Sequence, residues 1–130
     1  MSIMLGPRSL SRLVDVRPDL VRVVKRAAAM SSLDFTVLEG LRTVARQHAL
    51  MAQGATKTLN SRHLTGHAVD LAPMIGGTVR WDWPLYHQLA AIVKAAAAYE
   101  KVPVTWGGDW RTFKDGPHWE LPWKQYPKEK

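Results

Sequence analysis

The sequence contains no cysteine, which excludes disulfide bridges and metal sites built on thiolates. No apolar run approaches the roughly 18 to 20 residues that a membrane-spanning helix needs, so we expect no insertion into a membrane. The N-terminus also lacks the charged start and apolar core of a secretory signal, and we therefore expect the chain to be made and first held in the cytoplasm.

The chain has 130 residues, of which 46% are hydrophobic, and a formal net charge of +7. This length predicts one domain, residues 1–130, with a real core; we expect its polar tail to fray from about residue 122. The positive charge suits an anionic partner, such as nucleic acid, a membrane surface or an acidic wall polymer, or it serves solubility alone. No basic helix with regular aromatic residues is present, so we do not expect nucleic-acid binding.

Hydrophobic spacing predicts an α+β fold, in which about three helices pack against a small, mostly antiparallel sheet. Pro18 and Pro84 suit first helical positions, and Thr43 suits a helix cap. The expected helices cover residues 18–30, 44–52 and 84–99, and the expected strands cover residues 35–38, 67–71, 103–106 and 118–121. A stripe on the last helix should pack on the sheet: Leu85, Leu89, Ile92, Ala96 and Tyr99.

The stretch SRHLTGHAVD, residues 61–70, contains the first candidate ligands. Gly66 can adopt the positive φ of a tight turn, which would fold His63 back beside Asp70. If the strand at 118–121 pairs with the strand at 67–71, His118 joins them. Two imidazoles and one carboxylate form a zinc site that leaves a fourth position for water.

Two further carboxylates lie close to His118 in the sequence. Asp115 is a candidate general base that can accept a proton from the attacking water. Glu120 shares a strand face with His118, so it either orients that ligand or forms a plain salt bridge. Ligand spacing alone leaves open that these histidines are ordinary surface or hydrogen-bonded residues, because any chain with five histidines offers such pairs.

Other histidines and the tryptophans are weaker candidates. His67 should face away from Asp70 and be exposed, and two more histidines, His48 and His87, should lie on helix surfaces. All six tryptophans fall in the second half of the chain, where core filling is a commoner use than substrate stacking. We expect only Trp106 or Trp110 near the cleft.

Three motifs resemble one group of enzymes. SRHLTGHAVD matches serine-x-histidine-x-x-glycine-x-alanine-x-aspartate, the signature of the zinc peptidases that group lysostaphin, D-alanyl-D-alanine peptidases and the hedgehog signalling domain. WGGDWRTFKDGPHWE resembles the second half-site of phage L-alanyl-D-glutamate endopeptidases, and EGLRTVARQ resembles the same group's glycine-x-arginine segment. The resemblance covers residues 9–121 and keeps the order of the motifs.

This resemblance implies a hedgehog/D,D-peptidase-like fold and one zinc ion per chain, held by His63, Asp70 and His118. It implies Asp115 as the general base. Arg42 resembles the arginine that holds substrate oxygens and steadies the developing oxyanion, and Ser61 matches a position near the substrate.

The implied function is a zinc-dependent endopeptidase that cleaves the peptide stem of bacterial peptidoglycan at the L-alanyl-D-glutamate bond. It would act as a monomeric phage endolysin without a separate wall-binding domain, and it would reach the periplasm through a holin-type pore. The D-alanyl-D-alanine peptidases often have histidine-x-histidine at the final ligand, whereas His118-Trp119-Glu120 here favours the endopeptidase branch. The alternatives are a D,D-carboxypeptidase or dipeptidase, and a non-catalytic zinc-containing module that binds the wall.

Overall fold

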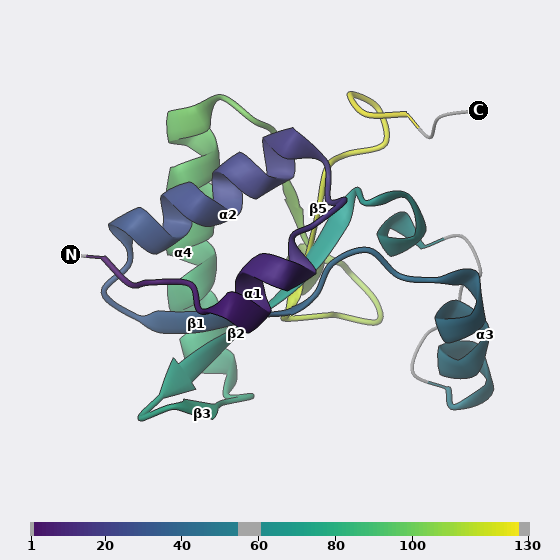
Figure 1. The fold of residues 1–130 in the computed structure, drawn as a ribbon, viewed down its shortest axis with the longest axis horizontal. Helices are drawn as coiled ribbons and strands as arrows, with labels where there is room; N and C mark the ends of the chain where they lie inside the picture. Colours follow the sequence, from purple (N-terminus) through teal and green to yellow (C-terminus); the bar gives the residue numbers. More distant parts are fainter. Residues whose placement is uncertain (1, 55–60, 128–130) are drawn as a thin grey trace.

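A computed structural model of the chain describes residues 2–54 and 61–127 (Figure 1). The α-helices are α1 (Pro7–Arg12), α2 (Pro18–Met30), α3 (Val44–Ala52) and α4 (Trp83–Glu100). The strands are β1 (Asp34–Glu39), β2 (Ala68–Ile75), β3 (Thr78–Val79), β4 (Thr105–Trp106) and β5 (His118–Glu120), and two short 3-10 helices are η1 (Arg62–Thr65) and η2 (Gly107–Asp109). The α+β prediction is confirmed, with four described helices in place of about three because the N-terminal turn forms α1.

The sheet is antiparallel throughout its described pairs and has the order β1-β2-β5-β4, with β3 paired to the far end of β2. Asp70 in β2 lies opposite His118 in β5, so the expected pairing of these two strands is confirmed. A β-bulge in β1 between Val37 and Glu39 places Glu39 opposite Asp70. Bulges of this kind turn a side chain toward a new neighbour, and this one adds a carboxylate next to Asp70.

Helix α2 begins at Pro18 and ends at Met30, as the sequence predicts. It buries an apolar stripe that packs against α4, which also contacts β2. Figure 1 shows the two helices crossing at one end of the molecule, while α3 lies at the opposite end. The described residues include no helix that is long and apolar enough to cross a membrane.

The buried face of α4 differs from the predicted stripe. Leu89 and Ala96 are buried as expected, but Tyr99 is 66% exposed and lies under the Arg26 guanidinium. The residues buried on this helix are Tyr86, Leu89, Ala90, Val93, Ala96 and Ala97. Helix α4 packs on both α2 and β2, so its buried surface is wider than the single apolar stripe that the sequence predicts. Small alanines make up the added part.

The segment that follows β5 contacts the rest of the protein as far as Tyr126. The buried guanidinium of Arg62 donates hydrogen bonds to the carbonyls of Leu121 (2.7 Å) and Tyr126 (2.6 Å) and stacks on the Trp123 ring. The Tyr126 hydroxyl donates to the Asp19 carboxylate in α2. A buried cation needs several acceptors, and the carbonyls after β5 supply them.

Candidate active site

His63 is positioned by a short helical turn. The Ser61 side chain caps η1 by accepting a hydrogen bond from the His63 N–H, and Gly66 ends η1 with φ = +74°. A Cβ at Gly66 would lie 2.4 Å from the Asp15 carbonyl oxygen, so the position requires glycine both for its φ and for its space. The turn brings His63 Nε2 to 3.2 Å from Asp70 Oδ1, as the sequence predicts.

The strand register brings in His118. Its Nδ1 lies 3.5 Å from Asp70 Oδ1, and the two imidazole rings meet edge to face at 5.1 Å. One ligand atom from each of His63, Asp70 and His118 lies within 4.8 Å of the others, so this group could hold a metal ion.

The outer nitrogen of each histidine is hydrogen-bonded to an acceptor. His63 Nδ1 donates to the Gly40 carbonyl (2.9 Å), and His118 Nε2 donates to Glu120 Oε1 (2.7 Å). These bonds leave His63 Nε2 and His118 Nδ1 facing Asp70, as the ring nitrogens that a metal ion could bind. Glu120 could either orient His118 or form a plain salt bridge. It is buried and hydrogen-bonds the ring nitrogen of His118 that faces away from Asp70.

The donor set and its two spacings to Asp70 are compatible with a tetrahedral zinc ion. Zinc bonds of about 2.0–2.1 Å require ligand atoms about 3.3–3.4 Å apart. The distances from Asp70 Oδ1 to His63 Nε2 and His118 Nδ1, 3.2 and 3.5 Å, bracket that value.

The pKa values of Asp70 and His118 both depart from their ordinary values. Burial alone would raise the pKa of Asp70, but the charges and hydrogen bonds of His63 and His118 hold it well below its usual range. Burial alone would lower the pKa of His118, but hydrogen bonds to Asp70 and Glu120 raise it to about 9. A metal ion that binds His118 Nδ1 near neutral pH must therefore displace a proton.

Asp115 lies in the loop that leads into β5, where its carbonyl accepts the His118 backbone N–H (3.2 Å). Burial and the nearby charge of Asp70 raise the pKa of its carboxyl. A Cβ at Gly107 would lie 2.4 Å from the Asp115 carbonyl oxygen and 3.0 Å from His118 Cβ, so glycine lets these segments approach. Gly107 lies within the motif WGGDWRTFKDGPHWE, but the spacing of that motif did not indicate that Gly107 allows the close approach of these segments.

Arg42 is nearly buried, with 8% of its side chain exposed. Its guanidinium binds the Glu39 carboxylate through Nε (3.0 Å) and Nη2, binds Gln47 Oε1 through Nη1 (2.8 Å), and lies 3.9 Å from Asp70 Oδ2. The structure thus places Arg42 beside the ligand group, held by two residues that sequence reasoning did not single out. The i, i+3 spacing of Glu39 and Arg42 could have indicated their ion pair. The bulge in β1 was not predictable from that spacing.

The expectation that His67 is exposed is wrong: it is 3% exposed. Its Nδ1 hydrogen-bonds the Thr65 hydroxyl at 2.6 Å, and its carbonyl accepts the Leu121 N–H. The turn before it and the segment after β5 cover it, which strand alternation cannot reveal. The other two non-ligand histidines, His48 and His87, are exposed as expected.

The two tryptophans expected near the cleft have different roles. Trp106 is buried, stacks on Trp119 with ring centroids 5.8 Å apart, and donates its indole N–H to the Gly116 carbonyl. Trp110 is half-buried, and its ring centroid lies 5.0 Å from that of His118. Trp106 therefore belongs to the core and Trp110 to the site.

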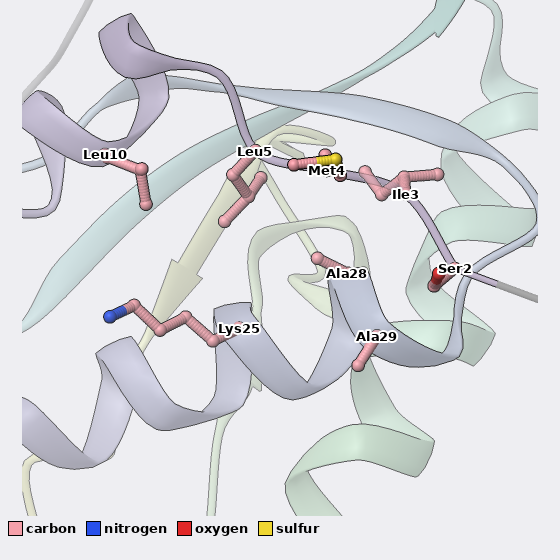
Figure 2. Close-up of a pocket in the computed structure, with 8 residues that line it drawn as sticks. All are labelled: Ser2, Ile3, Met4, Leu5, Leu10, Lys25, Ala28 and Ala29. Atoms are coloured by element: carbon pink, nitrogen blue, oxygen red, sulfur yellow. The ribbon is translucent and has the colours of Figure 1, made fainter.

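A hollow of about 340 Å³ lies elsewhere, between the N-terminal segment, α1 and α2. Figure 2 shows Met4 and Leu5 along one side and Lys25 and Ala28 along the other. Its lining is mainly apolar and includes none of the candidate ligands. Size alone does not make it the functional site, because the convergent polar groups lie at the β2–β5 pair.

Comparisons with known proteins identify relatives that cover most of the chain. Residues 1–121 match the family described as phage L-alanyl-D-glutamate peptidase. The L-alanyl-D-glutamate peptidase of Escherichia phage T5 is 33% identical over 119 residues, which cover 88% of this chain and 87% of that protein. The peptidoglycan L-alanyl-D-glutamate endopeptidase CwlK of Bacillus subtilis is 32% identical over 111 residues, covering 75% and 66%. The crystal structure of the Serratia marcescens L-Ala D-Glu endopeptidase ChiX matches with a TM-score of 0.91 and 47% identity, covering 98% of this chain and 96% of that one.

Proposed function

The chain belongs to the phage L-alanyl-D-glutamate peptidase family, and from that premise we propose that it is a zinc-dependent endopeptidase of peptidoglycan. The bond it cleaves is the one between L-alanine and D-glutamate in the stem peptide. The observation that carries the proposal is the group of His63, Asp70 and His118, in which both outer nitrogens are already hydrogen-bonded. An open three-ligand set of this kind is typical of catalytic zinc.

Zinc at this site would polarise the scissile carbonyl and lower the pKa of a water molecule toward about 7. The chain's own residues first fix the ligand geometry. Gly40 and Glu120 hold the two imidazole rings so that His63 Nε2 and His118 Nδ1 face the same point as Asp70 Oδ1. The rings therefore need little reorganisation when substrate arrives.

Asp115 is the proposed general base. Its carboxyl accepts the proton of the attacking water and then passes that proton to the leaving amine of D-glutamate. Its raised pKa supports this role, because a carboxylate with a higher proton affinity accepts a proton from water more readily. Gly107 supports it by allowing the Asp115 loop to lie close to His118.

Arg42 is proposed to hold an oxygen of the substrate near the scissile bond. Three of its N–H groups bind Glu39 and Gln47, which fix the plane of the guanidinium beside Asp70. An arginine has five N–H donors, so it can bind these partners and still face a carbonyl or carboxylate oxygen. Ser61 is proposed to line the substrate site from the start of η1, where its hydroxyl already caps the turn that carries His63.

Digestion of purified peptidoglycan followed by mass spectrometry tests the reaction. We expect muramoyl-L-alanine and released peptides that begin with D-glutamate, in zinc-loaded protein and not after chelation. Loss of terminal D-alanine alone would instead indicate a D,D-carboxypeptidase, and binding without products would indicate a non-catalytic module. Elemental analysis of the same sample should give about one zinc per chain, with His48→Ala, an exposed histidine, as the matched control.

The proposed biological role is that of an endolysin that acts on the wall once the inner membrane is permeable. Expression in a Gram-negative host should be harmless until a holin-type pore or chloroform opens that membrane, after which cells should lyse. Lysis on expression alone would show another route to the wall. We expect a monomer, which sedimentation of the zinc-loaded protein measures.

A further inference from the structure

The loop that follows η2 places an aromatic side chain against a proposed metal ligand. The Trp110 indole lies 5.0 Å from the His118 ring, measured between centroids, with the ring planes inclined by 42°. Unlike Trp106 and Trp119, which are buried in the core, Trp110 is half-buried. Part of the indole therefore remains available at the surface beside the site.

Hydrogen bonds within the same loop fix the backbone at Trp110. The backbone N–H of Trp110 donates to the Gly107 carbonyl (3.2 Å), and the Trp110 carbonyl accepts from Lys114 Nζ (2.7 Å). Phe113 takes a left-handed conformation with φ = +50° and is 46% exposed. A non-glycine residue with a positive φ is unfavourable, and such strain tends to occur at functional sites.

The chemistry of the substrate indicates what such a surface would bind. On the amine side of the scissile bond, D-glutamate and the residues after it carry carboxylates. On the acyl side, the L-alanyl methyl group, the lactyl group and the muramic sugar ring present apolar faces. An indole gains more from packing on apolar faces than from lying against carboxylates.

We propose that Trp110 is a specificity-determining residue that binds the acyl side of the scissile bond, packing on the L-alanyl and lactyl-sugar part of a muramoyl peptide. This assignment rests on the proposed function. Trp110 would thereby make the enzyme favour stem peptides still attached to the glycan strand over free peptides.

The test compares two substrates that differ only on the acyl side: a muramoyl tetrapeptide and the same tetrapeptide with an N-acetyl group in place of the muramoyl group. For Trp110→Ala we expect KM to rise about tenfold on the muramoyl substrate, the size expected for one aromatic contact, and to change little on the acetyl substrate. The kcat on both substrates and the zinc content should stay near wild type. Trp110→Phe should recover part of the lost affinity.

Trp81→Ala is the matched control, because Trp81 is 61% exposed and follows β3, at the end of β2 remote from Asp70. It should leave both KM values unchanged. An equal rise of KM on both substrates, no change on either, or a fall in kcat with loss of zinc would each overturn the assignment while leaving the peptidase reaction in place. Wild-type protein that cleaves neither substrate would overturn the proposed function, and this assignment with it.

Discussion

Removing the metal should make the stability of the protein fall as pH rises from 6.5 to 9. His118 is the cause: hydrogen bonds to Asp70 and Glu120 outweigh burial and raise its pKa from 6.5 to about 9. A histidine whose pKa is higher in the folded than in the unfolded state stabilises the fold below its unfolded value. That contribution is lost as pH rises through the folded value.

The size of the effect follows from the shift. Each pKa unit corresponds to 1.36 kcal/mol, so the metal-free protein should lose about 3 kcal/mol of unfolding free energy across this window. The side chain is only 7% exposed, so solvent screens the interaction little. The zinc-loaded protein should behave in the opposite way, because zinc needs the neutral imidazole and binds more tightly as protons become scarce.

Urea unfolding with chelator and with zinc, at half-unit steps from pH 6 to 9.5, measures both trends. Glu120→Gln is the informative variant, since it removes one of the two carboxylates bonded to His118 and should flatten the metal-free curve. Metal-free stability that stays level or rises across this window would refute the reasoning. Calorimetry of zinc binding at pH 7.5 in buffers of different ionisation enthalpy should independently detect the displaced proton.

Four substitutions test other parts of the site. Asp115→Asn should keep zinc and lower the turnover rate at least about 100-fold, the low end for a general base; near-normal turnover would place the base elsewhere. Gly107→Ala should cost about 1–3 kcal/mol of unfolding free energy and reduce activity, because its Cβ would lie 2.4 Å from the Asp115 carbonyl oxygen. His67→Ala should keep zinc, measured by elemental analysis, but lower the unfolding free energy by about 1–3 kcal/mol as a buried hydrogen-bonded group is lost. Tyr86→Phe should leave stability unchanged or raise it by about 1 kcal/mol, because the buried hydroxyl has no hydrogen-bond partner among the described residues.

The parts of the fold that the sequence predicts correctly depend on short-range rules. Pro18 begins α2, and the Thr43 hydroxyl caps α3 by accepting the Arg46 N–H. Strand alternation and Gly66 were enough to bring His63 beside Asp70. The pairing that brings in His118 stayed conditional on the residues alone and was implied by the family resemblance, and the strand register agrees with it.

The parts that could not be predicted depend on contacts between distant segments. Alternation gives the direction of His67 but not the Leu121 segment that covers it. The buried Arg62 guanidinium hydrogen-bonds carbonyls in the segment after β5. The polar sequence of that segment gives no indication of these contacts. The bulge in β1 decides that Glu39 lies opposite Asp70, and nothing in the local sequence marks it.

The charge of the site opposes the charge of the whole chain. The chain carries +7, yet the carboxylates of Glu39, Asp70, Asp115 and Glu120 gather around the candidate ligands, with Arg42 as the cation bonded within this group. Burial raises the pKa of the Asp115 carboxyl, and the like charge of Asp70 raises it further. A bound dication reverses that influence and favours the ionised form of Asp115. A bound metal would therefore act twice at this site, once through its own chemistry and once by offsetting the influence of Asp70 on the pKa of the proposed base.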